Sequence, residues 1–240
     1  MGAIVDFHSH ILPAMDDGSK TPQESIAMLE MQKEQGIQRV LATPHFDARV
    51  DTPEKFLKRR EEAKAMLDSA CFYCPGLPAV TLGAEVRYFP GMSHCEALEG
   101  LAIEGTKTIL IEMPFTPWEE SHYRELEGIY IKNGITPIVA HIDRYIRPFH
   151  THGIPERLEQ MPVLVQANAE FFLRSSTRNM AMKMLKKDRI HLLGSDCHNL
   201  SSRSPDLGDA VELIEQKLGE NALAGIQIYQ DDVLNSSLIL

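Results

Sequence analysis

The stretch VDFHSHILPAMDDG, residues 5–18, places two histidines two positions apart directly after a short apolar run. Residues i and i+2 of an extended segment point to the same side, so His8 and His10 can reach into one site. Asp16 and Asp17 follow in the next loop, at the same end of the predicted strand. We expect one of these aspartates, Asp17 in preference to Asp16, to join the two histidines as a metal ligand.

Apolar runs alternate with helical patterns along the rest of the chain. The expected strands are residues 3–7, 38–42, 79–83, 108–112, 136–140, 163–166 and 191–193. The expected helices are residues 23–35, 53–69, 118–133, 155–160, 179–187, 206–218 and 220–234. This alternation indicates right-handed βαβ units and a parallel sheet. We predict a single α/β domain over residues 1–240 that forms a closed or nearly closed barrel.

Side chains that can bind a metal ion or a substrate follow each predicted strand. In parallel α/β folds, active sites form at the carboxyl ends of the strands. The candidate metal ligands at these ends are His8, His10, His45, Glu85, Glu112, His141, Asp196 and His198. Gln166 and Asn168 follow the sixth strand in the same way. Cys197 lies between two candidate ligands in an extended segment, so we expect it to point away from them.

The donor set indicates the class of metal ion and the charge of the substrate. Imidazole and carboxylate donors without thiolate suit Mn²⁺, Zn²⁺ or Fe²⁺. With Asp17 included, four carboxylates carry a charge of −4, whereas three divalent ions would carry +6. Such a pocket is positive and favours a phosphorylated substrate. Arg144 and Arg203 follow candidate ligands closely, and we expect both to clamp the phosphoryl group through forked hydrogen bonds.

Composition narrows the class of partner. The 240 residues include 24 Lys and Arg against 34 Asp and Glu, a formal net charge of −10. An acidic chain is a poor candidate for nucleic-acid binding, which needs a basic surface. No apolar run approaches the roughly 20 residues that cross a bilayer, and the N-terminus lacks the basic region of a signal peptide. We therefore expect a cytoplasmic protein with no membrane insertion.

Several motifs together resemble the PHP family, which is named after polymerases and histidinol phosphatases. The matching segments are DFHSH (6–10), ATPHF (42–46), AHIDR (140–144) and GSDCHN (194–199). The longer segments HSHILPAMDDGSK (8–20) and ILIEMPF (109–115) are similar to one branch of that family. This branch is the manganese-dependent bacterial protein-tyrosine phosphatases of the CpsB/YwqE type, encoded with capsule and exopolysaccharide genes.

The resemblance implies a distorted (βα)7 TIM-like barrel, the PHP fold, with up to three Mn²⁺ ions. It implies a first ion held by His8, His10, Glu85 and Asp196. It implies that Glu85 bridges to a second ion, held also by Glu112 and His141. It implies a third ion held by Asp17, His45 and His198. The implied substrate is phosphotyrosine on a tyrosine kinase of polysaccharide export, whose tyrosine-rich tail would enter an open site.

The segment after Gly219 resembles the family less well. We expect it to serve packing within the chain or contacts in a homo-oligomer.

Two other phosphatase chemistries are open at this point. A histidinol-phosphate phosphatase would use the same metal core, but we see no long lid between the second and third strands to close over a small substrate. A thiol-based tyrosine phosphatase would use Cys197 and Arg203, which have C-x₅-R spacing. No glycine lies between them, although a phosphate-binding loop usually needs one.

Overall fold

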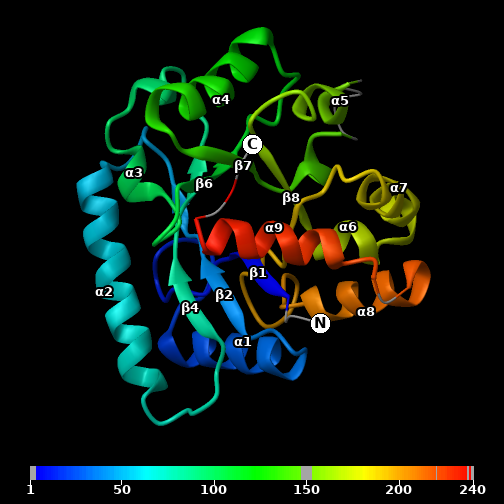
Figure 1. Ribbon diagram of the computed structural model, residues 1–240. Helices are drawn as coiled ribbons and strands as arrows, with labels where there is room; N and C mark the ends of the chain where they lie inside the picture. The colour runs from blue at the N-terminus through cyan, green and yellow to red at the C-terminus, as the bar shows by residue number, and fades with distance from the viewer. Residues whose placement is uncertain (1–3, 147–152, 220, 237, 239–240) are drawn as a thin grey trace.

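The computed structural model describes residues 4–146, 153–219, 221–236 and 238. Parallel strands form the centre, and helices lie around them (Figure 1). The strands are β1 (Val5–Ser9), β2 (Arg39–Ala42), β3 (His45–Phe46), β4 (Ala79–Leu82), β5 (Glu85–Arg87), β6 (Thr108–Glu112), β7 (Thr136–Val139), β8 (Leu164–Asn168) and β9 (Leu192–Gly194).

Helices or helical turns follow most strands, as the alternation in the sequence predicts. The helices are α1 (Pro22–Glu34), α2 (Pro53–Cys71), α3 (Leu98–Leu101), α4 (Glu120–Asn133), α5 (Ile154–Leu158), α6 (Ala169–Leu173), α7 (Ser175–Lys186), α8 (Leu207–Leu218) and α9 (Ala224–Leu234). Two 3₁₀ turns are η1 (Met92–His94) and η2 (Ile142–Arg144). The ends have local causes: Thr21 accepts a hydrogen bond from Glu24 N–H at the start of α1, and left-handed Gly134 ends α4.

β2 and β4 match the second and third predicted strands, and each is followed after two residues by a short strand, β3 or β5, that the sequence pattern did not predict. β1, β2 and β4 form one sheet in the order β1-β2-β4, with β2 between the other two, and β3 and β5 begin a second sheet in the order β3-β5-β6-β7-β8-β9. Pro44 lies between β2 and β3 and has no N–H to donate to a ladder. This arrangement places His45 and Glu85 as register partners at the start of β3 and β5.

The first and last strands lie side by side at their carboxyl ends. Asp196 N–H donates to His8 C=O at 2.7 Å, and His10 N–H donates to Cys197 C=O at 2.9 Å. Ser9 and Cys197 also form an isolated parallel bridge. These bonds bring the histidine pair and the GSDCHN segment to the same place, although most of the chain separates them.

Other boundaries differ from the prediction. The predicted helix 179–187 begins earlier, at α7, and α6 precedes it without a predicted counterpart. The predicted strand 163–166 extends to Asn168. Polar residues dominate the first turn of α7, so the sequence there lacks the apolar residues whose helical spacing would predict a helix. Residue 3 of the first predicted strand and residue 220 of the last predicted helix lie outside the described residues.

The C-terminal helix α9 covers the amino ends of the strands, opposite the candidate ligands. Val233 packs into the apolar cluster between the strands, which includes Val5, Phe7 and Leu110. Gln230 Oε1 accepts a hydrogen bond from Val5 N–H at 3.1 Å, and Figure 1 shows α9 crossing near β1. The segment after Gly219 therefore packs within the chain, as one of the two expected roles requires. Contacts in a homo-oligomer stay a prediction.

The charged variant Val233→Asp is expected to lower the free energy of unfolding by about 3 kcal/mol, because it buries a carboxylate among apolar side chains. Ile228→Asp on the same helix is the matched control, since Ile228 is 61% exposed and Val233 is 1% exposed. Urea unfolding followed by far-UV circular dichroism measures both. Equal midpoints for the two variants would show that α9 does not close this end of the strands.

Within the described residues, no helix is long and apolar enough to cross a bilayer. The cytoplasmic location expected from the sequence stays a prediction.

Candidate metal centre

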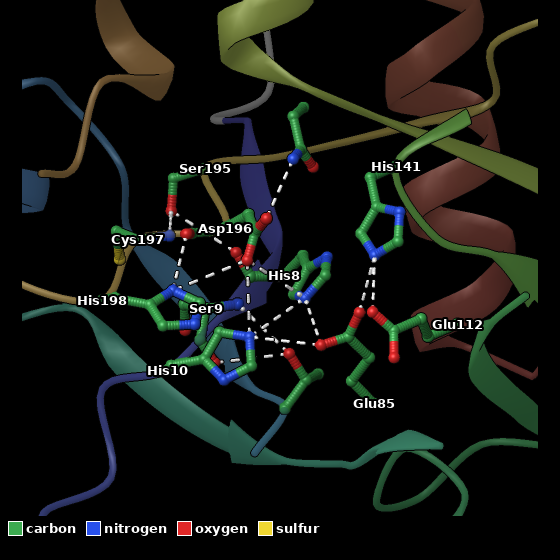
Figure 2. A network of polar contacts seen from close by, with 12 residues as sticks. His8, Ser9, His10, Glu85, Glu112, His141, Ser195, Asp196, Cys197 and His198 are labelled. Atoms are coloured by element: carbon green, nitrogen blue, oxygen red, sulfur yellow. Dashed lines mark hydrogen bonds and ion pairs between the residues drawn. The ribbon is translucent and has the colours of Figure 1, made fainter. Parts of the chain in front are cut away.

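The predicted ligands come together at the carboxyl ends of the strands (Figure 2). His8 lies in β1 and His10 just beyond it, and their Nε2 atoms are 3.2 Å apart. The prediction that the two side chains share a face is therefore confirmed. His141 follows β7 and stacks near His8, with ring centroids 5.6 Å apart. His198 follows β9, and its ring centroid lies 3.8 Å from that of His10.

Glu85 lies at the centre of the imidazoles. Its Oε2 atom is 2.9 Å from His45 Nδ1, 3.2 Å from His8 Nε2 and 3.3 Å from His10 Nε2. Its Oε1 atom lies 2.8 Å from His141 Nε2. Among the described residues, the buried Oε2 atom nevertheless has no hydrogen-bond partner with acceptable geometry. Imidazole nitrogens crowded around a buried carboxylate oxygen that has no hydrogen-bond partner are what a metal site requires, so these residues fit a bound cation.

Asp196 lies on the other side of the histidine pair. Its Oδ1 atom is 3.4 Å from His10 Nε2 and 3.6 Å from His8 Nε2. The guanidinium groups of Arg144 and Arg203 both bond to this carboxylate, Arg203 Nη2 at 2.8 Å from Oδ1. The structure thus places both predicted phosphoryl-binding arginines beside the candidate ligands.

The two adjacent aspartates of the first loop have different positions. Asp16 is largely buried, and its Oδ2 atom lies 2.8 Å from His10 Nδ1 and accepts a hydrogen bond from His45 N–H. Asp17 is 65% exposed, and its Oδ1 atom lies 3.4 Å from both His45 Nε2 and His198 Nε2. Asp16 therefore orients the His10 ring from behind, and Asp17 faces the candidate ligands, as preferred from the sequence.

Glu112 lies at the edge of the cluster. Its Oε1 atom is 3.8 Å from His141 Nε2, and its Oε2 atom is 3.2 Å from Arg87 Nε. Three groups of candidate ligands have donor atoms within 4.8 Å of one another. These groups are His10, Asp17, His45 and His198; His8, His10 and Glu85; and His45, Glu85 and Glu112. The arrangement has room for more than one ion, with Glu85 shared between two groups.

The protonation states suit cation binding. Burial opposes the charged form of Glu85, but the imidazoles around it, among them His10 and His141, hold the pKa of this carboxyl well below its usual value. Burial, together with the nearby His10, lowers the pKa of His198 to about 4, so its imidazole is neutral at pH 7. Burial also lowers the pKa of His141. An ionised carboxylate and neutral imidazoles are the forms that coordinate a metal ion.

His10, like His45, differs from His141 and His198, because its pKa is raised rather than lowered. Burial alone would lower its pKa, but the carboxylates of Asp16, Asp196 and Glu85 outweigh burial and raise that pKa well above its usual value. The surrounding carboxylates therefore favour positive charge at this point. A bound cation satisfies the same requirement, and its binding would release the proton.

Two candidate ligands have an unusual backbone conformation. His141 and Asp196 have positive φ angles of 33° and 54°, a region that residues other than glycine rarely adopt. Such strain concentrates at functional sites, where the surrounding structure maintains it. Gly194 supports the arrangement, because a Cβ atom there would lie 2.6 Å from His8 Cβ.

A layer of polar side chains supports the ligands from below. Asn168 Nδ2 donates to Asp196 Oδ2 at 3.0 Å, and Gln166 Oε1 accepts from His141 N–H at 2.7 Å. Beneath them, Asp6 accepts hydrogen bonds from Ser195 N–H and from Gln32 Nε2. Gln166 and Asn168 are visible in the sequence as strand-end residues. The hydrogen bond from Gln32 to Asp6 cannot be identified from the sequence, because Gln32 lies on α1 and no motif marks it.

Cys197 points away from the cluster, as predicted (Figure 2). It is fully buried, and Gln32 Nε2 lies 3.8 Å from its sulfur. Burial, with the nearby Asp6 carboxylate, raises the pKa of this thiol far above its usual value. A nucleophilic cysteine requires an accessible thiolate. The geometry therefore argues against the thiol mechanism.

The fold and this cluster define a parallel α/β protein with a candidate polynuclear metal centre at its strand ends. The family described as "Capsular polysaccharide synthesis, CpsB/CapC" matches residues 4–234, and the chain belongs to this family. The tyrosine-protein phosphatase CpsB of Streptococcus pneumoniae is 30% identical over 231 residues, covering 90% of this chain and 91% of that protein. The tyrosine-protein phosphatase YwqE of Bacillus subtilis is 28% identical, covering 90% and 85%.

A solved structure has the same fold. It comes from a study of YwqE from Bacillus subtilis and CpsB from Streptococcus pneumoniae, described as unique metal-dependent tyrosine phosphatases. It superposes with a TM-score of 0.85 at 24% identity, covering 99% of this chain and 96% of that one. The resemblance found in the sequence motifs is thereby confirmed.

Proposed function

We propose that this protein is a metal-dependent protein-tyrosine phosphatase that uses Mn²⁺. The observation that carries the proposal is the convergence of four imidazoles on the Glu85 carboxylate, with two arginines beside it at Asp196. Membership of a family whose curated relatives are tyrosine-protein phosphatases supports the same activity.

We assign the ions to residues as the family resemblance implies. His8, His10, Glu85 and Asp196 would hold one ion; Glu85, Glu112 and His141 a second; and Asp17, His45 and His198 a third. The donor groups of His8, His10 and Glu85 and of Asp17, His45 and His198 support the first and third ions. Glu85 and Glu112 share a group with His45, and His141 Nε2 lies 2.8 Å from Glu85 Oε1 and 3.8 Å from Glu112 Oε1. Mn²⁺ is proposed over Zn²⁺ or Fe²⁺ on the resemblance, since the oxygen and nitrogen donors suit all three metals. Such ions supply an activated water and neutralise charge on the phosphoryl oxygens.

The arginines would bind the substrate. Arg144 and Arg203 are each about one-third exposed, so their guanidinium groups can reach a phosphoryl group while they stay anchored to Asp196. A planar guanidinium can donate two hydrogen bonds to two phosphoryl oxygens at once. This contact orients the phosphorus atom relative to the ligand cluster and strengthens as charge develops on the oxygens.

The proposed substrate is a phosphotyrosine on a tyrosine kinase of capsule or exopolysaccharide synthesis. The family description and the names of the curated relatives support this partner. The large exposed fraction of Asp17 supports a site open enough for a protein segment. We further propose that residues 1–240 form one phosphatase domain, a distorted (βα)7 barrel closed by the hydrogen bonds between His8, His10 and the segment around Cys197.

The experiment that tests this function compares a phosphotyrosine peptide with histidinol phosphate, both with added Mn²⁺. We expect kcat/KM to be at least about 10-fold higher for the peptide, because relatives with this metal core are named tyrosine phosphatases. Glu85→Gln should remove the activity, and Glu30→Gln, at an exposed position of α1, is its matched control. A preference for histidinol phosphate would replace this proposal with the alternative activity.

A further inference from the structure

Three aromatic side chains pack together beside the candidate metal centre: Phe115, Trp118 and Tyr145. We name this group the aromatic shelf. The rings of Phe115 and Tyr145 are stacked with centroids 5.7 Å apart and an interplanar angle of 27°. Trp118 packs against Tyr145 with centroids 5.0 Å apart. The shelf occupies the region that follows β6 and β7, next to two strands that carry candidate ligands.

The inner part of the shelf is fixed. Tyr145 is fully buried, and its hydroxyl accepts a hydrogen bond from Met113 N–H at 2.8 Å. Trp118 Nε1 donates to Pro114 C=O at 3.2 Å. Both bonds hold the segment that carries Phe115, so the Phe115 ring needs little ordering to meet a ligand.

Phe115 lies on the outer part of the shelf and borders the ligand cluster. Its ring is nearly parallel to the His141 imidazole, with centroids 6.0 Å apart and an interplanar angle of 20°. It is 39% exposed, although large apolar side chains are usually buried. The charged groups of Arg144, Arg203 and Asp17 are also partly exposed at this end of the strands. A partly exposed aromatic ring therefore lies at the same end of the strands as these three charged side chains.

A phosphotyrosine has two chemically different parts, and the site offers a surface for each. Its phosphoryl group requires cations and forked hydrogen-bond donors, which the ligand cluster and the arginines provide. Its phenyl ring requires an apolar surface a few ångströms away, where aromatic rings pack with centroids about 4.5–7 Å apart. The Phe115 ring centroid lies 6.0 Å from that of His141, which is within this range.

Resting on the proposed phosphatase activity, we propose that Phe115 binds the phenyl ring of the phosphotyrosine and thereby selects aromatic over alkyl phosphomonoesters. A phosphoserine carries no ring, so it can use the arginines but not the shelf. Phe115 is then a specificity-determining residue, and Trp118 and Tyr145 position it.

The test measures kcat/KM with Mn²⁺ for one peptide carrying either phosphotyrosine or phosphoserine. Phe115→Ala is expected to lower the phosphotyrosine-to-phosphoserine ratio of kcat/KM by about 10-fold, mainly through KM, because it removes the ring contact. Phe115→Tyr keeps the ring and should restore the ratio to within about 2-fold of the unchanged protein. Val50→Ala is the matched control, because Val50 is an exposed apolar residue that follows β3.

Manganese content, measured by elemental analysis, distinguishes a substrate contact from a structural role through His141. The inference is overturned when Phe115→Ala leaves the phosphotyrosine-to-phosphoserine ratio of kcat/KM unchanged. If kcat/KM falls equally for both peptides and manganese content falls with it, Phe115 has a structural role instead. An unchanged protein that hydrolyses neither peptide would overturn the proposed phosphatase activity, and this inference with it. Full activity with an unaffected ratio in Phe115→Ala would overturn this inference alone.

Discussion

Removal of divalent ions with EDTA is expected to lower phosphotyrosine hydrolysis by at least about 1,000-fold, and added Mn²⁺ should restore it. The expected loss is large because the thiol nearest the cluster among the described residues, that of Cys197, is buried and points away, so it cannot replace a metal-activated water. Rate measurements on a phosphotyrosine peptide before chelation, after chelation and after Mn²⁺ addition test this expectation.

The control for this prediction is Cys197→Ala. Since the pKa of this thiol is far above its usual value, the variant should keep its phosphatase activity. Its free energy of unfolding should fall slightly, because a buried side chain becomes smaller. Activity that survives chelation but disappears in Cys197→Ala would establish the thiol mechanism and refute the metal-dependent one. The C-x₅-R spacing with Arg203 would then have been the correct sequence signal.

The second large effect is expected for Arg144→Ala, which should lower kcat by about 100-fold while the protein keeps its manganese. The guanidinium is anchored to Asp196 but is about one-third exposed, so a phosphoryl oxygen can approach it. Its loss leaves Asp196 bonded to Arg203 and Asn168, which should hold this carboxylate in place. Arg144→Lys should be intermediate, because it keeps the charge but loses the fork.

The measurements are steady-state kinetics and metal content on the same preparations. Arg124→Ala removes an exposed arginine of α4 and is the matched control. If Arg144→Ala instead loses manganese in proportion to activity, the arginine acts by holding Asp196. Direct binding of the phosphoryl group would then be refuted.

The order of elements and the identity of the candidate site followed from local chemistry in the sequence. Apolar runs and capping residues such as Thr21 and Gly134 act over a few positions, so they can be identified without the tertiary structure. The i and i+2 relation placed His8 and His10 on one face for the same reason. The strand-end pattern was informative because parallel strands gather their carboxyl ends at one side of the molecule.

The tertiary structure decided what depends on contacts between distant segments. The short strands β3 and β5, which were not predicted, belong to a different sheet from β2 and β4, and a hydrophobic pattern does not encode pairing partners. Gln32 and Phe115 gain their roles only from what lies against them, Asp6 in one case and His141 in the other. Asp16 and Asp17 are adjacent carboxylates with the same chemistry. Only the loop conformation turns one toward the back of His10 and the other toward His45 and His198.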